Sequence, residues 1–573
     1  MPGDRLIPTP VAPTVATFTV LSDGTEVSRE HQILSLVIDK SVNRIPAATL
    51  VIRDGDAANQ TFAVSETDLF IPGKEIEIKA GYQGTEDTVF KGMVISQSLK
   101  VREQKSVLIV KCRDQAFRMT LSPRNRYFRE MTDSDVLEAV LDEIGLDKDI
   151  EATTDERQEV VQYNCTDWDF VLTRADAIGK ICLVEDGKIS IAKPDLLQEV
   201  ALHLEFGASI LDFDAELDAR TQFKSVQSLG WSGADQEVLE ATEDSFRAPD
   251  ASNLSSEDLA DVHTIDPLRQ QHSGAVKEVE LQQWAAARLQ KSRLAKIRGR
   301  AKFQGIATVL PGRIVELAGV GDRFNGKVFV SGIRHELAAG NWVTNVEFGL
   351  DDQWFVERYR VRQPPAGGLI PPITGLHIGI VTQLENDPLG EDRVMVRLPL
   401  IDQQDEGSWA RVAAMDAGEN RGSFFRPEIG DEVVLGFLQD DPRNPIILGM
   451  LNSSAKPAPI TASDDNHEKG FVTRSGTKLV FNDEHNNVLV ETPDGNLIHV
   501  SGEDQAITLA DQHGNKIVMD SSGITLESNK DITLKAAGNL LGEGVDVTMK
   551  GQGTAEFSAG GTNTIKGGIV QIN

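Results

Sequence analysis

The chain has 573 residues, a formal net charge of −31 and a hydrophobic content of 40%. This length exceeds what a single hydrophobic core can organise, so we expect about three to four domains. The acidic balance argues against proteins that hold nucleic acid or anionic lipid through charge, because both ligands require basic surfaces.

The three cysteines, Cys112, Cys165 and Cys182, lie far apart and form no Cys-x-x-Cys pair. This spacing predicts neither a zinc site nor a disulfide framework, and it is typical of a protein made in a reducing compartment. The N-terminal segment lacks a basic stretch followed by an apolar one. We therefore expect cytoplasmic synthesis without a signal peptide. No apolar run is long enough to predict a membrane span.

Short β-branched runs between turn residues predict strands across residues 15–110. Two helices are expected after these strands. Thr132 or Asp133 can cap the first helix, and Gly145 can end it. The second helix is expected over about residues 166–179.

The next part of the chain predicts a hairpin, an insertion, a helix and a return to strands. The hairpin turns at Asp186-Gly187, a pair that favours tight two-residue turns. Residues 241–275 are polar and acidic, so we expect a mobile surface insertion there. A helix is expected over about residues 279–298, and strands over residues 313–349.

Two linkers are predicted on either side of a small β-domain. Proline and glycine dominate the first linker, residues 366–376, and prolines recur in the second, residues 452–473. Between them, residues 377–451 hold five short apolar runs, which suggest a small closed barrel. The runs are Gly379–Leu384, Arg393–Leu398, Trp409–Ala414, Glu432–Leu438 and Ile446–Met450.

The tail, residues 474–573, follows a different plan. Short alternating apolar segments recur between Gly, Asn and Asp turns, for example at 488–490, 507–509, 532–534 and 547–549. Each segment offers only a few inward apolar side chains, so one copy of the tail buries little. Three chains wound round one axis would complete the core and leave no free sheet edge. A single-chain β-solenoid is the alternative.

Residues 377–459 carry an ordered series of motifs. They are Asp392-Arg393-Val394, Trp409-Ala410-Arg411-Val412, Arg421-Gly422, Pro427–Val433 and Asp441–Pro445. This series resembles the barrel of the VgrG-type spike proteins of type VI secretion systems, contractile phage tails and extracellular phage-tail-like particles. Residues 160–192 resemble a segment of the hub in the same family, and the tail resembles its β-helical needle.

The resemblance implies a mainly β fold in three parts. These are a hub of two β-barrel-like domains with a few helices (residues 1–365), a five-stranded OB-type barrel (377–451) and a trimeric β-helical needle (474–573). It also implies a structural function, as the central spike of a contractile injection system, closest to the extracellular phage-tail-like particles, which are released from the cell.

The partners that the resemblance implies are those of an assembled injection particle. They are two further copies of the chain in a homotrimer, a hexameric inner tube protein, baseplate proteins and a PAAR-type tip protein. Transient contact with the target membrane is implied as well, whereas no nucleic acid is expected as a partner.

The last residues of the chain predict the docking site of the tip protein. Ile569, Val570, Gln571, Ile572 and Asn573 form an alternating strand with an apolar face. Three copies would present a small, blunt apolar end. Members of the family cover such an end with a cone-shaped PAAR-type protein. The histidines lie far from this end, so no metal plug is expected.

We expect no enzyme activity, no cofactor and no metal. Residues 321–328 nearly spell a phosphate-binding loop but lack its final Ser or Thr. The pairs His335-Glu336 and His467-Glu468 lack the second histidine of a zinc-protease helix. The linker after the barrel is too short for a catalytic domain, which needs at least about 50 residues. Trp409 is expected in the barrel core rather than as a ligand platform.

Two other classes of function stay open on the sequence alone. A polysaccharide-degrading β-solenoid would need aromatic sugar platforms, and the tail is almost free of aromatic residues. A nucleic-acid-binding barrel is disfavoured by the net charge. A sizing measurement separates the spike, which needs about three chains, from both alternatives.

Overall fold

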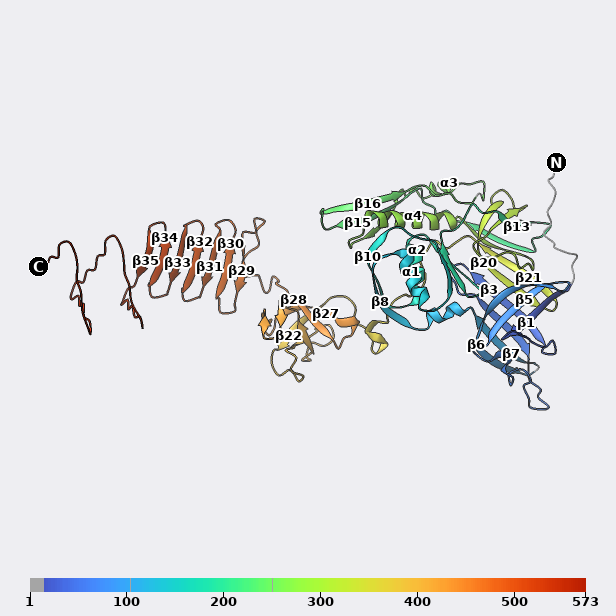
Figure 1. Cartoon of the computed structure of the whole chain (residues 1–573), viewed down its shortest axis with the longest axis horizontal. Coiled ribbons are helices and arrows are strands. Elements are labelled where there is room, and N and C mark those ends of the chain that lie inside the picture. The colour runs from blue at the N-terminus through green and yellow to red at the C-terminus, as the bar shows by residue number, and fades with distance from the viewer. Residues whose placement is uncertain (1–14, 104, 250, 573) are drawn as a thin grey trace. The chain divides into compact units, whose positions relative to one another are not determined.

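The structure, a computed structural model, describes residues 15–103, 105–249 and 251–572. The chain divides into two compact units, Met1–Gly367 and Gly368–Asn573, and each is described by itself (Figure 1). In the part that the structure describes, no helix has the length and apolar character needed to cross a membrane.

A 13-stranded sheet forms the frame of the first unit. Its order is β14-β18-β21-β20-β3-β4-β7-β6-β5-β1-β2, and β19 joins β13 to β20. The strands are β1 (Ala16–Ser22), β2 (Thr25–Glu26), β3 (Ile33–Ser41), β4 (Ala47–Arg53), β5 (Glu75–Tyr82), β6 (Thr85–Arg102), β7 (Lys105–Arg113), β13 (Val200–Glu205), β14 (Asp212–Leu217), β18 (Ile297–Gln304), β19 (Ile314–Ala318), β20 (Gly326–Ala338) and β21 (Asn341–Phe348).

Two separate apolar cores lie on this one sheet. The first gathers side chains of β1 and β3–β7, such as Leu36 and Phe90. The second gathers side chains of β13 and β18–β21, such as Val315 and Phe348. The long strand β20 serves both, because Ile333 belongs to the second core and Leu337 to the first. The two β-domains of the expected hub are therefore fused into one continuous sheet.

Helices α1 (Asp133–Asp142) and α2 (Asp167–Ala177) lie where the sequence predicts two helices, and they cover a third core. Thr132 caps α1 in a capping box with Asp135, and Thr166 caps α2. Gly145 follows α1 with a φ of 71°, as expected for a residue that ends a helix. Around them lie β8 (Pro123–Thr132), β9 (Asp147–Ile150), β10 (Glu156–Thr166), β11 (Ile181–Glu185) and β12 (Lys188–Ala192). Strands β11 and β12 form the predicted hairpin.

Helix α4 (Glu278–Leu294) packs against a three-stranded sheet and ends earlier than predicted, because β18 already begins at Ile297. The sheet consists of β15 (Val226–Ser232), β16 (Glu237–Glu243) and β17 (Leu268–His272). Two short helices, α3 (Ser256–Ala260) and α5 (Phe355–Arg358), complete the unit.

Residues 241–275, predicted as a mobile surface insertion, contain paired and buried positions that the prediction did not include. Strand β17 pairs in parallel with β15, and Ala251 is buried in the second core. Lys296 donates a hydrogen bond to the Ala251 carbonyl at 2.7 Å, and Arg293 lies 3.0 Å from Glu257. Backbone pairing and a few small buried side chains hold this segment. Neither feature can be predicted from its polar composition.

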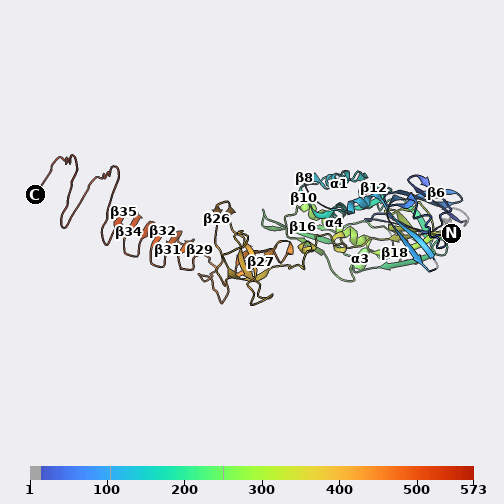
Figure 2. The ribbon, with the colours of Figure 1, turned by 90° about the horizontal axis from the view of Figure 1, so that it is seen from below.

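The barrel of the second unit closes in the order β22-β23-β24-β28-β27, and each strand lies where the sequence predicts one. The strands are β22 (His377–Gln383), β23 (Val394–Arg397), β24 (Ser408–Val412), β27 (Glu432–Phe437) and β28 (Pro445–Met450). Between β24 and β27, the short strands β25 (Ala417–Gly418) and β26 (Arg421–Gly422) form a hairpin (Figure 2).

Trp409 does not belong to the barrel core, contrary to the prediction. Its neighbour Ala410 is completely buried, so alternation along β24 turns the indole outward. The half-buried ring lies beneath the Arg393 guanidinium, which is 6.0 Å from the ring centroid.

A seven-stranded antiparallel ladder follows the barrel, in sequence order from β29 to β35. The strands are β29 (Glu468–Val472), β30 (Lys478–Asn482), β31 (Asn487–Glu491), β32 (Leu497–Ser501), β33 (Ala506–Ala510), β34 (Lys516–Asp520) and β35 (Gly523–Glu527). Strand β29 falls within the predicted second linker. Residues 528–572 hold no strand, so the segments predicted at 532–534 and 547–549 find no partner within their own chain.

Candidate assembly surfaces

One face of the strand ladder is apolar along its length. The register aligns the apolar residues of β30–β35 in two columns that share this face. One column holds Phe481, Val488, Val500, Ile507, Met519 and Ile524, and the other holds Leu479, Val490, Ile498, Leu509, Ile517 and Leu526. We call these columns the apolar face.

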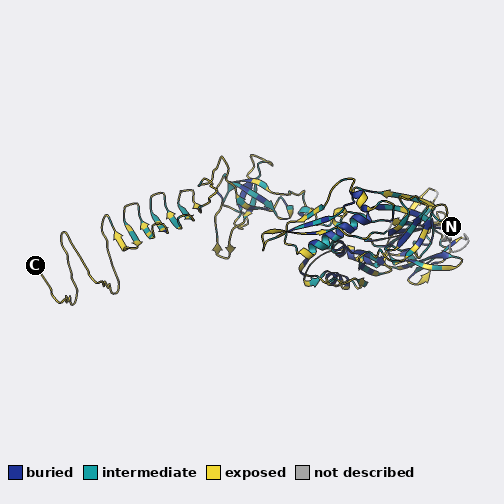
Figure 3. Ribbon diagram, turned by 90° about the horizontal axis from the view of Figure 1, so that it is seen from above, coloured by how far each residue is buried: buried dark blue, intermediate teal, exposed yellow. Residues whose placement is uncertain are grey.

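The apolar face is uncovered in the single chain. None of its side chains is fully buried, and Ile498 at its centre is 46% exposed. Figure 3 shows the contrast, since the barrel interior is dark blue whereas the ladder strands are mostly teal and yellow. A soluble protein rarely leaves a contiguous apolar surface of this extent in water, so the ladder requires a covering surface.

The opposite face of the ladder is mixed, because its central column alternates between apolar residues such as Leu489 and Val518 and polar ones. Its central positions include His499 and Thr508, which pair across β32 and β33. Near its edge, cross-strand ion pairs join Lys478 to Glu491 at 2.6 Å and Lys516 to Glu527 at 3.0 Å. Both columns of the apolar face are apolar throughout, whereas the opposite face carries the ion pairs and polar residues, so the apolar face is the one that needs covering.

Two loops of the barrel are fixed by paired charges. Arg393 donates hydrogen bonds to both carboxylate oxygens of Asp387, and it holds the pKa of Asp387 well below its usual range. Hydrogen bonds from Arg443 lower the pKa of Asp441 to about 2. These carboxylates stay ionised at any physiological pH, so they are turn-fixing groups rather than acid–base catalysts.

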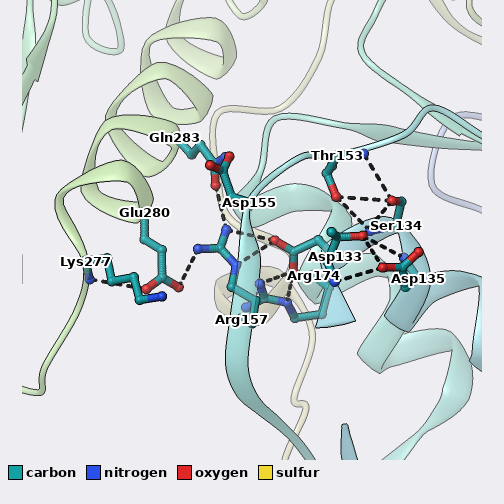
Figure 4. A network of polar contacts seen from close by, with 11 residues as sticks. Asp133, Ser134, Asp135, Thr153, Asp155, Arg157, Arg174, Lys277, Glu280 and Gln283 are labelled. Carbon is teal, nitrogen blue, oxygen red and sulfur yellow. Dashed lines mark hydrogen bonds and ion pairs between the residues drawn. The ribbon is translucent and has the colours of Figure 1, made fainter. Parts of the chain in front are cut away.

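A buried polar network joins four elements of the hub (Figure 4). Asp133, at the first position of α1, accepts hydrogen bonds from Arg157 of β10 at 2.8 and 2.9 Å and from Arg174 of α2. Arg157 also reaches α4, where it contacts Glu280 at 2.9 Å and Gln283 at 2.6 Å. Opposite charges compensate one another inside the hub, so the network is a cross-link between elements.

The sequence suggests Asp133 only as a possible helix cap. Thr132 takes that role, and Asp133 instead forms ion pairs with two arginines. An acidic residue in the first turn of a helix is common on surfaces, so the sequence holds no signal for this burial.

Two buried cysteines and the loop at residues 321–328 lack the surroundings that their chemistry would need. Burial raises the pKa of Cys112 and of Cys182 to about 12, which suppresses the reactive thiolate. Residues 321–325 form a turn and β20 follows at Gly326, where a phosphate-binding loop would need a helix. Among residues 15–103, 105–249 and 251–572, no group of three or more His, Cys, Asp or Glu side chains could hold a metal ion.

The predicted tip residues Ile569, Val570, Gln571 and Ile572 are exposed and lie outside any strand of the single chain. Asn573 lies outside the described residues. The structure places no other described element of the same chain as a strand partner beside this end.

Three family models match successive parts of the chain. A model described as the Alg8 N-terminal domain matches residues 12–339, which is more than half of the chain. A model described as the type VI secretion system/phage-baseplate injector OB domain matches residues 377–451. A third, described as the phage baseplate V C-terminal trimerisation domain, matches residues 487–573.

Curated relatives include type VI secretion system spike proteins of Pseudomonas aeruginosa. VgrG1b is 25% identical over 260 residues, which cover 42% of this chain and 34% of VgrG1b. VgrG1a is 32% identical over 124 residues, which cover 20% of this chain and 19% of VgrG1a. The chain thus spans about a third or less of the length of these relatives.

Solved structures that align with the chain include phage-tail and secretion proteins. The tail protein from Neisseria meningitidis MC58 aligns with a TM-score of 0.45 at 17% identity, over 60% of this chain and 98% of that one. The E. coli c3393 protein, a component of the type VI secretion system, aligns with a TM-score of 0.37 at 15% identity, over 75% and 99%. On the family models and the curated relatives, the chain belongs to the Alg8 N-terminal domain family and is a VgrG-type spike protein.

Proposed function

We propose that the protein is the central spike of a contractile injection system. It forms a homotrimer that docks the inner tube and the baseplate, carries a tip protein and pierces the target envelope. The uncovered apolar face of the strand ladder is the observation that carries this proposal. A trimer built on that face is a structural part, and its function requires no active site.

Three ladders packed with their apolar faces toward a common axis would form a closed prism. Each large apolar side chain buried in this way contributes roughly 1.5–3 kcal/mol, and the columns repeat in every chain. The outer faces would carry the Lys–Glu pairs into water. Residues 528–572, which have no strand partner in their own chain, would pair with the other two chains beyond the prism.

The hub, residues 1–365, would dock the tube and the baseplate. Each chain carries two β-cores on one sheet, so a trimer presents six β-units around its axis. A hexameric inner tube protein needs six similar surfaces. This internal duplication would resolve the mismatch between a trimeric spike and a hexameric tube.

The end of the chain would carry the tip protein. Ile569, Val570 and Ile572 are exposed apolar side chains, and three copies would gather them at one blunt end. A PAAR-type protein that covers this end, Gln571 and Asn573 included, would bury the apolar surface and sharpen the point. Contact with the target membrane would then be brief and mechanical.

A matched pair of substitutions in β33 tests the trimer. Leu509 lies on the apolar face and Thr508 on the opposite face. Leu509→Asp would place three carboxylates in the prism core, where unpaired charge is very costly, so we expect loss of the trimer. Thr508→Asp should leave the trimer intact. Light scattering measures both variants, and an equal mass for the two would contradict the proposed packing.

A further inference from the structure

The loop between β24 and β27 carries an exposed apolar surface of its own. We call residues 413–430 the arm. Its large apolar side chains are mostly in water: Phe424 is 83% exposed and Met415 is 81% exposed, and Phe425 and Ile429 are exposed as well. The barrel core is complete without them, since none of the four belongs to it.

The arm has little internal support. Its hairpin is held by the residue pairs Ala417↔Gly422 and Gly418↔Arg421, by an ion pair between Arg421 and Asp416 at 2.8 Å, and by a backbone hydrogen bond from Ser423 to the Asp416 carbonyl at 2.8 Å. A two-stranded ribbon of this length is not stable by itself in water. The arm therefore needs a covering surface from outside its own hairpin.

Part of that surface is the start of the ladder. The Phe425 ring stacks on the Phe471 ring of β29, with centroids 5.0 Å apart and an angle of 11° between the planes. Phe471 pairs with Leu479, which is a member of the apolar face, so both side chains point to the same side. An ion pair of 2.7 Å between Glu428 and Arg474 fixes the contact. Phe425 thus continues the apolar face of the ladder, and its neighbour Phe424 stays exposed beside it.

We infer that the arm is a clasp between chains, in which Phe424 of one copy packs on β29 and β30 of the neighbouring copy. The inference rests on the proposed trimer. Since Phe425 joins the arm to the apolar face through Phe471, a second copy that covers the face would also reach the arm. The clasp would couple each barrel to the neighbouring ladder, so that the ladders start in a common register.

Photo-crosslinking in the full chain tests the clasp. A benzophenone amino acid replaces Phe424 in one variant and Leu400 in the control, since Leu400 is an exposed apolar residue on another loop of the same barrel. In trimers mixed from isotopically light and heavy chains, position 424 should crosslink to residues 468–482 of another chain. Position 400 should give no such product. Crosslinks from position 424 only within its own chain, only to another protein, or to nothing would overturn the clasp.

A second measurement keeps the clasp testable if the crosslinker perturbs the loop. Phe424→Ser should lower the temperature at which the full-length trimer dissociates, whereas Leu400→Ser should leave it unchanged. Equal temperatures for the two variants would reject the clasp. The mass of the unmodified protein separates the proposed trimer from the proposed clasp. If the protein is a monomer, the trimer is rejected; if it is a trimer without the crosslink, only the clasp is rejected.

Discussion

Asp133 lies buried between the buried Arg157 and the half-buried Arg174, and its charge offsets the cost of burying Arg157. Asp133→Asn keeps the shape of the side chain and removes the charge. Breaking a buried ion pair in this way costs about 3–5 kcal/mol, so we expect a marked loss of hub stability. Denaturant unfolding followed by tryptophan fluorescence measures the change, because most tryptophans lie in the hub.

The control for this prediction lies on the same helix. Asp142 forms a 2.6 Å ion pair with Lys148, and the Asp142 carboxylate is largely exposed. Exposed pairs contribute at most about 1 kcal/mol, so Asp142→Asn should barely shift the unfolding midpoint. Similar midpoints for the two variants would show that the buried network does not cross-link the hub.

His335 gives the hub a defined dependence on pH. Burial, with a smaller contribution from the charge of Lys40, lowers its pKa to about 3. The folded hub therefore leaves His335 neutral, whereas the unfolded chain binds a proton below about pH 6.5. The stability that this difference contributes is complete above pH 6.5 and is lost as the pH falls toward 3, by up to about 1.4 kcal/mol per pH unit.

Unfolding midpoints between pH 7.5 and 4.5 check this prediction. His335→Gln should flatten the pH dependence, even if it lowers stability overall, and His272→Gln should preserve it, because His272 is exposed. If the slope of the His335→Gln variant equals that of the unmodified chain, the buried imidazole is not its source.

For single elements, a substitution at the end of the needle tests the proposed docking of the tip protein. Ile572→Asp would bring three carboxylates together under the proposed PAAR-type cap, so repulsion and desolvation should both oppose docking. The trimer should survive, because the ladder is untouched. Co-purification of the cap with unmodified and variant spikes measures the effect, and equal recovery with both would place the cap elsewhere.

The elements that the sequence predicts well are those with a local signal. Thr132 and Thr166 begin helices as capping residues, and the five barrel strands show apolar alternation between turn residues. The elements that it misses depend on distant partners. Strand β17 and the buried Ala251 are stabilised by residues far along the chain, and a polar composition hides them. The burial of Asp133 likewise depends on distant residues, Arg157 and Arg174.

In the tail, the sequence predicts strands that the single chain does not form. Segments 532–534 and 547–549 have strand-like sequences but no intrachain partner. The apolar face could be predicted from alternation, but its two columns follow from the register of β30–β35, which the sequence leaves open. A partner chain would supply strand partners for the two segments and a covering surface for the apolar face.

For the whole molecule, the number of chains in the assembly decides whether the proposed trimeric spike is correct. Light scattering of the purified full-length protein should give about three times the 62.5 kDa mass of one chain. Removal of residues 474–573 should reduce the assembly to a monomer or to a trimer that dissociates at a lower temperature. A stable full-length monomer of 62.5 kDa would contradict the account, because the apolar face would then exist in water without the partners proposed for it.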